Sequence, residues 1–305
     1  TTDQVLVLST GALKAVTTSV VNVLTTTQLN ALSSSTVQTL GADGLNNLTS
    51  TQMGTLTSTS VGNLSTAQIA ALSTENLKAI ATGALQGVSS TQLNALGSSQ
   101  VQALTSRQVQ ALTSTQLNSM STEQVANLSS AQVQVLTSSQ LNALNSTALQ
   151  ALETGDVQAL SSTQIQSLSS TQLNKLSDDQ VKALSSTQVQ ALSTGQVQAL
   201  TSVQLNGLSS DAVQALSSSQ LQKLTTGQLQ TLTTEQLNTL TSDQVQALTT
   251  SQVQALTTVQ VRDVATSQVV NLSSAQVKAL SSTQLTILSS VSMQAIETAD
   301  LAAIT

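Results

Sequence analysis

Aliphatic residues recur at two fixed places in every eight residues of this chain. Division of the sequence into octads from Thr1 gives 38 units with Thr305 left over, and no insertion or deletion breaks the register. The consensus is [ST]-[ST]-x-Q-[VL]-[QN]-A-L, as residues 184–202 show twice in LSSTQVQALSTGQVQALTS. The fifth and eighth places are aliphatic or Met in all 38 octads. We therefore predict that these two places form the core.

Each octad also carries the signals of a helix start. In residues 185–192, Ser185 and Gln188 have the spacing of a capping box, and Leu184 with Val189 has the spacing of a hydrophobic staple. The first place is Ser or Thr in 31 octads, and the fourth is Gln in 26. The pattern predicts an N-cap, about six helical residues and an immediate restart in every unit.

A β-solenoid with one short strand per octad is the alternative. Val and Thr favour strands, and stacked Gln or Ser/Thr ladders stabilise β-coils. However, octads such as 185–192 lack the Gly, Asn-Gly and Asp-Gly signals that corners usually need. Thirteen of the 14 acidic residues occupy the first four places, and seven of the eight basic residues occupy the sixth or seventh; the exceptions are Asp263 and Arg107. This charge polarity favours helices, because a helix has an electrical polarity that a strand almost lacks.

The expected fold is all-α, a slender α-solenoid of about 38 octapeptide units. Because isolated helices shorter than about 12–15 residues are marginal in water, neighbouring units must hold each helix. Winding three or four octads per turn around a common axis would bury every apolar stripe and leave a coat of Ser, Thr, Gln and Asn. Small seventh-place residues, usually Ala, would let backbones approach closely. We expect one continuous solenoid over 1–305, more divergent over 1–88 and near consensus over 89–305.

The composition excludes several classes of function. The chain has no Phe, Tyr, Trp, His, Cys or Pro, and only 7% of its residues are charged. The usual general base and the thiolate nucleophile are therefore missing, and we expect no enzyme and no cofactor. The net charge of −6 argues against a nucleic-acid partner, and the longest apolar runs fall far short of the roughly 20 residues that a membrane helix needs.

Few residues qualify as candidates for a chemical site, and each has a simpler structural explanation. Asp178 and Asp179 form the only acidic pair, but the first turn of a helix favours acids. Thr1 is a formal candidate for an N-terminal nucleophile. Glu123 and Glu235 lack the spacing of a calcium β-roll, so we expect no metal site. The third-place glycines form no phosphate-binding loop, and we interpret them as exposed positions at which glycine is tolerated: Gly11, Gly83, Gly155, Gly195 and Gly227.

Residues 112–136, LTSTQLNSMSTEQVANLSSAQVQVL, carry a motif that covers essentially the whole chain. It resembles the Leu-[Ser/Thr]-x-x-Gln-[Val/Leu] arrays of large secreted bacterial surface proteins, which are often labelled adhesin-like or haem-utilisation proteins. The resemblance implies an extracellular extension or surface fibre. The haem label is not carried over, because only Met53, Met120 and Met293 offer a side-chain axial ligand.

These observations predict a non-enzymatic structural protein, an extracellular solenoid stalk or filament subunit of a bacterial surface. The alternative is an adhesin or ice-binding module that uses Ser/Thr/Gln rows on the solenoid surface. The first octads are rich in aliphatics and the last ends in DLAAI, so neither end shows a polar cap. We therefore expect self-association end to end, or further repeats of the same chain, with a surface glycan or cell-surface partner as a further option.

Overall fold

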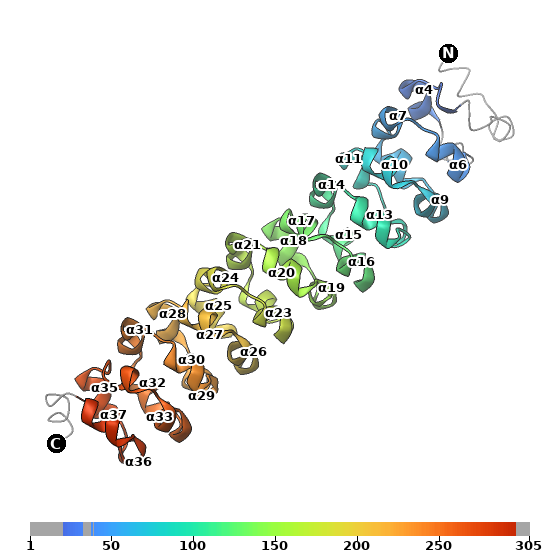
Figure 1. Ribbon diagram of the computed structural model, residues 1–305. Helices are drawn as coiled ribbons and strands as arrows, with labels where there is room; N and C mark the ends of the chain where they lie inside the picture. The colour runs from blue at the N-terminus through green and yellow to red at the C-terminus, as the bar shows by residue number, and fades with distance from the viewer. Residues whose placement is uncertain (1–20, 33–37, 39, 297–305) are drawn as a thin grey trace. The chain divides into compact units, whose positions relative to one another are not determined.

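The computed structural model describes residues 21–32, 38 and 40–296, and within these residues all the regular secondary structure is helical. It comprises 33 helices of four to six residues, numbered here by octad. The prediction of one short helix per octad is confirmed for these residues, and the β-solenoid alternative is wrong for them. Figure 1 shows the helices as short coils joined by extended segments.

The chain divides into two compact units, Thr1–Ala159 and Leu160–Thr305. The first unit contains α4 (Thr26–Ala31), α6 (Gly41–Asn46), α7 (Ser50–Gly54), α8 (Ser58–Gly62), α9 (Thr66–Ala71), α10 (Thr74–Ala79), α11 (Thr82–Leu85), α12 (Ser90–Asn94), α13 (Ser98–Ala103), α14 (Ser106–Ala111), α15 (Ser114–Ser119), α16 (Thr122–Ala126), α17 (Ser130–Gln134), α18 (Ser138–Ala143), α19 (Ser146–Ala151) and α20 (Thr154–Ala159).

The second unit contains α21 (Ser162–Ser167), α22 (Ser170–Leu173), α23 (Asp178–Lys182), α24 (Ser186–Ala191), α25 (Thr194–Ala199), α26 (Ser202–Gly207), α27 (Ser210–Gln214), α28 (Ser218–Lys223), α29 (Thr226–Thr231), α30 (Thr234–Asn238), α31 (Ser242–Ala247), α32 (Thr250–Ala255), α33 (Thr258–Asp263), α34 (Thr266–Val269), α35 (Ser274–Ala279), α36 (Ser282–Ile287) and α37 (Ser290–Ala295).

The predicted capping box forms in most of the described octads. Before α24, the Ser185 N–H donates to Gln188 Oε1 at 2.9 Å, and the Gln188 N–H donates to Ser185 Oγ at 3.3 Å. The helix ends because Leu192 and Ser193 both have extended backbone, with φ/ψ of −59°/140° and −68°/158°. We call this extended link, from the seventh place of one octad to the first place of the next, a corner. Each corner therefore stops one helix and caps the next.

Three octads make one turn of the coil. Within the first unit, each helix packs on the helix three octads away, so that α8, α11, α14, α17 and α20 form one stack. Labels α11, α14 and α17 follow one another along one side in Figure 1. The second unit repeats the arrangement, with α23, α26, α29, α32 and α35 in one stack and α24, α27, α30 and α33 in another. Each unit is thus a solenoid with a 24-residue turn and three stacks of helices.

The core is built from the fifth and eighth places, as predicted. Val189 is fully buried, and Leu192 is 4% exposed. The pattern holds through most of both units and loosens in the last described turns. There, several aliphatic residues at these places are partly exposed: Leu256, Val264, Leu272, Leu285, Leu288 and Met293.

Two stacked helices approach closely at a glycine. A Cβ atom built on Gly87, at a seventh place, would lie 2.1 Å from the carbonyl oxygen of Ser58 in the preceding turn. Such a contact is sterically impossible, so only glycine fits at this position in the observed backbone. The expected close approach at small seventh-place residues is confirmed here.

Candidate functional site: the glutamine contacts between turns

The fourth-place glutamine joins the start of its own helix to the end of a helix in the preceding turn. Gln220 Oε1 accepts the N–H of Ser217 at 2.7 Å, which completes the capping box of α28. Its Nε2 donates to the carbonyl oxygens of Leu192 at 2.7 Å and Val189 at 3.1 Å. Those carbonyls belong to the last turn of α24, four octads earlier, and a helix end leaves such groups without internal partners. One side chain therefore serves two helix termini.

This contact recurs along both units. Among the described residues, at least twenty fourth-place glutamines donate to the eighth-place carbonyl 28 residues earlier, at 2.6–3.1 Å. Many also reach the fifth-place carbonyl 31 residues earlier, as Gln108 does with Leu77 at 2.8 Å. The result is a ladder of amide groups through the interior, which we call the glutamine ladder. It gives successive turns the same polar joint.

The glutamine ladder corrects the expected distribution of polar residues. The sequence predicts a coat that includes glutamine, yet the fourth-place glutamines are mostly buried, with Gln108 only 1% exposed. Burial of an amide is tolerated because its oxygen and nitrogen both find partners. The capping-box spacing reveals the first of these partners. The second lies in another turn, about which the octad spacing gives no information.

Several octads of the first unit lack the glutamine, and the last two of them are consecutive. Ala148 replaces it before Leu149, and Asp156 replaces it in the next octad. Asp156 is 4% exposed and accepts hydrogen bonds from Ser130 Oγ at 2.8 Å and from the N–H of Glu153 at 3.3 Å. A carboxylate has no N–H to offer to the carbonyls of the preceding turn. This part of the first unit is therefore held by fewer glutamine contacts.

The 24-residue turn shows how the exposed third-place residues line up. In the second unit all the third-place residues of three stacks are exposed, and each stack mixes residue types. The three rows are Thr163, Thr187, Asp211, Glu235, Val259 and Thr283; Thr171, Gly195, Ser219 and Asp243; and Asp179, Val203, Gly227, Ser251 and Ala275. Gly, Val, Asp and Glu thus interrupt each row of hydroxyl groups.

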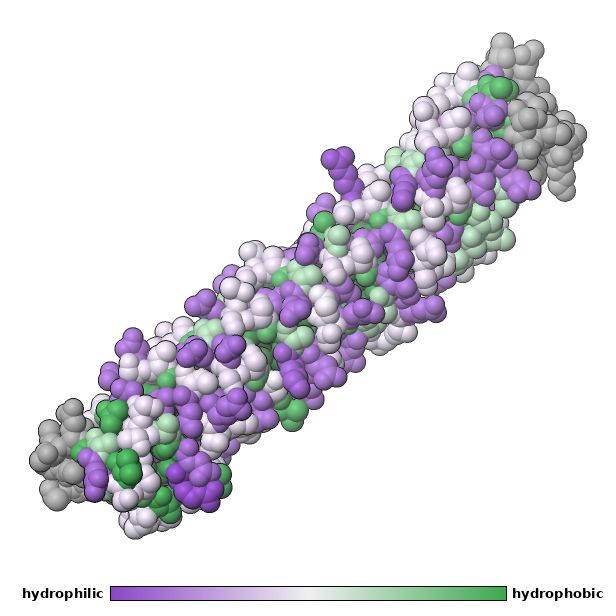
Figure 2. Space-filling model, viewed as in Figure 1, coloured by the Kyte–Doolittle hydropathy of each residue, from purple (hydrophilic) through white to green (hydrophobic). Residues whose placement is uncertain are grey.

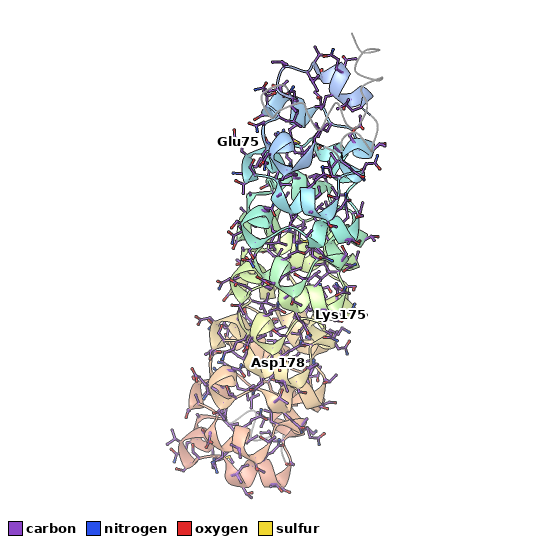
Figure 3. The ribbon with its side chains drawn as sticks, turned by 90° about the vertical axis from the view of Figure 1, so that its right-hand side faces the viewer. Glu75, Lys175 and Asp178 are labelled. Carbon is purple, nitrogen blue, oxygen red and sulfur yellow. The ribbon has the colours of Figure 1, made fainter. Side chains whose placement is uncertain are left out.

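The sequence candidates lie apart from one another. Asp178 and Asp179 are exposed in the first turn of α23, and Figure 3 labels Asp178 together with Lys175 and Glu75. Lys175 Nζ donates to Gln172 Oε1 at 3.1 Å. Three third-place glycines have open space where a side chain would stand: Gly83, Gly155 and Gly195; Gly227 has a single contact at 4.0 Å. Thr1 and Gly11 fall outside the described residues.

The methionines occupy core places. Met53 is fully buried at a fifth place, Met120 is 6% exposed at an eighth place, and Met293 is partly buried in the last described turn. Each packs as an aliphatic side chain does. Over 21–32, 38 and 40–296, no three Asp or Glu residues gather as a metal-binding group, and Glu123 and Glu235 stand at exposed third places.

An apolar cavity of about 50 Å³ lies inside the second unit. Its lining includes Val245, Val253, Val261 and Val264, together with neighbouring leucines and Gln268. Five successive octads have Val at the fifth place here, and Val264 replaces the usual Leu at an eighth place. Short side chains at both core places explain the gap, because the turn keeps its spacing while the filling volume falls.

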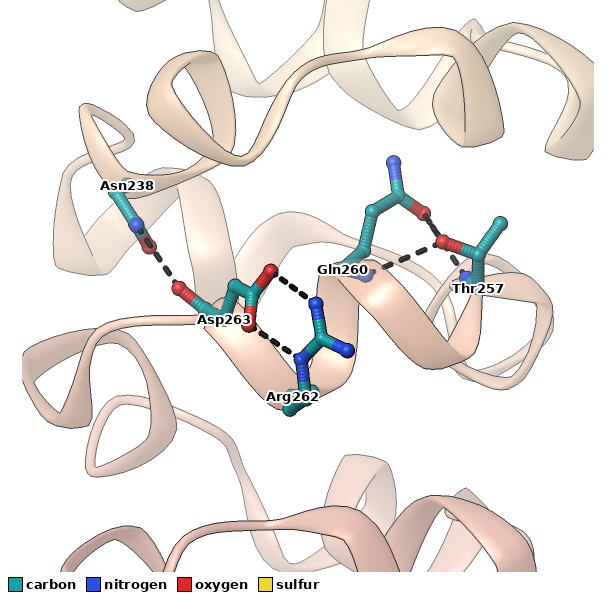
Figure 4. A network of polar contacts seen from close by, with 5 residues as sticks. All are labelled: Asn238, Thr257, Gln260, Arg262 and Asp263. Atoms are coloured by element: carbon teal, nitrogen blue, oxygen red, sulfur yellow. Dashed lines mark hydrogen bonds and ion pairs between the residues drawn. The ribbon is translucent and has the colours of Figure 1, made fainter.

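Arg262 and Asp263 form an ion pair at the end of α33, close to the capping box of Thr257 and Gln260 (Figure 4). The distance from Arg262 Nε to Asp263 Oδ1 is 2.6 Å. The hydrogen bond from Arg262 lowers the pKa of Asp263, and the same bond raises the pKa of Arg262. Both side chains are largely exposed, so solvent screens this pair.

Polar side chains cover most of the face shown in Figure 2, and hydrophobic residues appear in small patches that are denser around the last described turn. The strongly exposed apolar residues are Val23, Val203, Val259, Val270 and Val291. None of the described helices has the length and apolar character that a membrane span requires.

Comparison with known proteins identifies the repeat. No curated protein matches the chain. The ALTTAQ repeat matches five segments, residues 77–114, 114–146, 149–186, 189–226 and 221–258, which together cover more than half of the chain. These segments include the near-consensus octads in which the capping box and the glutamine ladder are most regular. The chain therefore belongs to the ALTTAQ repeat family.

Proposed function

We propose that this chain is a non-enzymatic structural protein that serves as a stalk or filament subunit outside a bacterial cell. The observation that carries the proposal is the glutamine ladder, which gives successive turns one and the same joint. A solenoid with equivalent joints can be extended by adding repeats, because each turn needs only its neighbours. Its length is then set by the number of octads, which is what a spacer requires.

Equivalent joints also support the proposed end-to-end association. The contacts that Gln220 makes with Leu192 and Val189 use groups that near-consensus octads share. Further repeats of the same chain, or another copy, could supply the next turn with the same donors and acceptors. Heterologous contacts of this kind that do not close on themselves build filaments.

The alternative, an adhesin or ice-binding module, draws less support from the arrangement of the side chains. Such a surface needs regular rows of like groups, and the third-place rows of the second unit mix hydroxyl groups with Gly, Val, Asp and Glu. The fourth-place glutamines are buried, so they cannot form surface rows. Binding of ice or glycan by the purified chain would favour this alternative.

The spacer function can be tested by removing one turn. Thr171 and Asp243 are exposed third-place residues in one stack of the second unit, 72 residues and three turns apart. Because the chain has no Cys, spin labels on Thr171→Cys and Asp243→Cys report one distance by electron resonance. Deletion of 185–208 should keep the protein folded and shorten this distance by about a third. A deletion variant that unfolds, or that keeps the original distance, would contradict the proposal.

Localisation and association need separate measurements. Protease treatment and antibody labelling of intact cells of the source organism should reach the chain if it lies outside the cell. Light scattering of the purified chain over a range of concentrations should show a rising mass if chains join end to end. A chain that is protected in intact cells, or that keeps the monomer mass at high concentration, would contradict the respective part of the proposal.

A further inference from the structure

Three sixth-place asparagines contact a corner of the following turn with both ends of their side-chain amide. Asn118 Nδ2 donates to the carbonyl oxygen of Ala143 at 2.7 Å, and Asn118 Oδ1 accepts the N–H of Asn145 at 2.7 Å. Residues 143 and 145 are the two ends of the corner before α19. The asparagine therefore satisfies the last carbonyl of one helix and the first N–H of the next from outside their octads.

Asn46 and Asn238 repeat this geometry. Asn46 bonds to the carbonyl oxygen of Ala71 and the N–H of Ser73, at 2.7 and 2.8 Å. Asn238 bonds to the carbonyl oxygen of Asp263 and the N–H of Ala265, at 3.3 and 2.8 Å, and Figure 4 shows the first of these contacts. The spacing is 25 and 27 residues in all three cases, so the same part of the turn is involved each time.

At these three corners the N–H of the first-place residue is bound by the asparagine and not by its own octad. The side chains of Ser73 and Asn145 still accept the fourth-place N–H of their own octads. The octad that begins with Asn145 has Ala148 at its fourth place, and the octad that begins with Ser73 has Asn76 there, whose side chain is shorter than that of glutamine. The third corner begins with Ala265, which has no hydroxyl group, and Gln268 Oε1 has no partner there because Asn238 holds the N–H of Ala265.

A corner with an intact capping box gives the comparison. Asn206 donates to the carbonyl oxygen of Thr231 in the next turn, as the other asparagines do. The N–H of Thr233, however, donates to Gln236 Oε1 at 2.8 Å, inside its own octad. Asn30 makes only the donor contact, to the carbonyl oxygen of Thr55 at 2.8 Å, although the octad of that corner has Ser60 in place of glutamine and no capping box. A missing glutamine alone therefore does not produce the double contact. The double contact is described at three corners, those before α10, α19 and α34.

We propose that Asn46, Asn118 and Asn238 are positioning residues that cap helices α10, α19 and α34 from the preceding turn. Each accepts the first-place N–H that a fourth-place glutamine binds in a complete capping box, and each ties a corner that departs from consensus to one particular octad. Since octads near consensus are almost interchangeable, such pairs fix which octad lies under which corner. A single buried asparagine sets register in coiled coils by the same logic.

Hydrogen exchange at the N–H of residue 145, resolved by fragmentation mass spectrometry, tests the proposal. Asn118→Ala should speed this exchange about five- to tenfold, because one hydrogen bond to a helix start is lost. Ala148→Gln in the same chain should restore slow exchange by rebuilding the capping box. Ala126→Asn, which offers an asparagine one octad away, should not restore it. Asn206→Ala is the matched control and should leave exchange at Thr233 unchanged.

Circular dichroism establishes that each variant keeps its helices, so the readout is local. Unchanged exchange at residue 145 in Asn118→Ala would overturn the proposal. So would a double variant with Ala148→Gln that exchanges as fast as Asn118→Ala, or rescue by Ala126→Asn, which would show that the pairing is not specific to one octad.

Discussion

Gln220 Nε2 donates to the carbonyl oxygen of Leu192 at 2.7 Å, across 28 residues of chain. The same side chain caps its own helix through Oε1. Its two polar atoms thus bind one N–H at a helix start and two carbonyl oxygens at a helix end. The described helices have at most six residues, so their termini are a large share of the backbone, and hydrogen bonding of these termini is a main condition of stability.

Substitution of this glutamine tests the ladder. Gln220→Met keeps the volume of the side chain and removes its hydrogen bonds, so the Ser217 N–H and the carbonyl oxygens of Leu192 and Val189 lose partners. We expect a loss of about 2–4 kcal/mol in the free energy of unfolding, measured by denaturant titration. Gln222→Met, at the exposed sixth place of the same octad, is the control and should change it by less than about 0.5 kcal/mol. Equal effects of the two would argue against the ladder.

A charged side chain at the eighth place should destabilise the protein. Leu192 is 4% exposed, so Leu192→Asp buries an unpaired carboxylate and should lower the free energy of unfolding by more than about 3 kcal/mol. Thr187→Asp places the same group at an exposed third place in the first turn of α24. There the helix dipole makes the change neutral or slightly stabilising. Thermal unfolding monitored by circular dichroism compares the two, and a stable Leu192→Asp variant would mean that the eighth place is not core.

The cavity in the second unit should accept a larger side chain. Val264→Leu restores the usual eighth-place residue next to a gap of about 50 Å³, and we expect a stabilisation of about 0.5–1 kcal/mol. Val259→Leu adds the same methylene group at a side chain that is 51% exposed, and it should have little effect. Calorimetry of both variants checks the prediction. A destabilised Val264→Leu variant would show that the surrounding turn cannot accommodate the added group.

Two glycines of one octad should respond in opposite directions to alanine. Gly87→Ala forces the backbone near Ser58 to move and should cost about 1–3 kcal/mol. Gly83 lies inside α11 with open space around it, so Gly83→Ala should be neutral or stabilising by up to about 1 kcal/mol. Denaturant titration of both variants decides this. Similar changes for both would contradict the close approach at Gly87.

The Arg262–Asp263 pair predicts a small dependence of stability on pH. The pKa of Asp263 is lowered in the folded protein by its hydrogen bond with Arg262. The pair therefore contributes stability above the usual pKa of Asp, and this contribution is lost as pH falls through the lowered value. The difference in melting temperature between the wild type and Asp263→Asn should shrink on acidification. A difference that grows on acidification would have the wrong sign.

The sequence predicts the local structure well and the contacts between turns poorly. Ser185, Gln188, Leu184 and Val189 carry a helix start within eight residues, and the structure has a helix there. The number of octads per turn cannot be predicted in the same way, because nearly identical octads give no signal for which of them will be neighbours. The second partner of Gln188 depends on that number. So does the contact of Asn118 with Ala143 and Asn145, which can be expected from the sequence only once the 24-residue turn is known.

The short reach of the glutamine ladder bears on how such a chain can form. Its bonds span 28 to 31 residues, about a tenth of the chain, and this span does not grow when octads are added. Chains with local contacts close small loops and fold fast, whereas distant pairings slow folding. Each ladder acceptor also precedes its donor in the sequence, so a turn emerging from synthesis or export finds its acceptors already made. A longer chain of this kind should therefore fold by addition at its growing end, with no extra delay for each repeat.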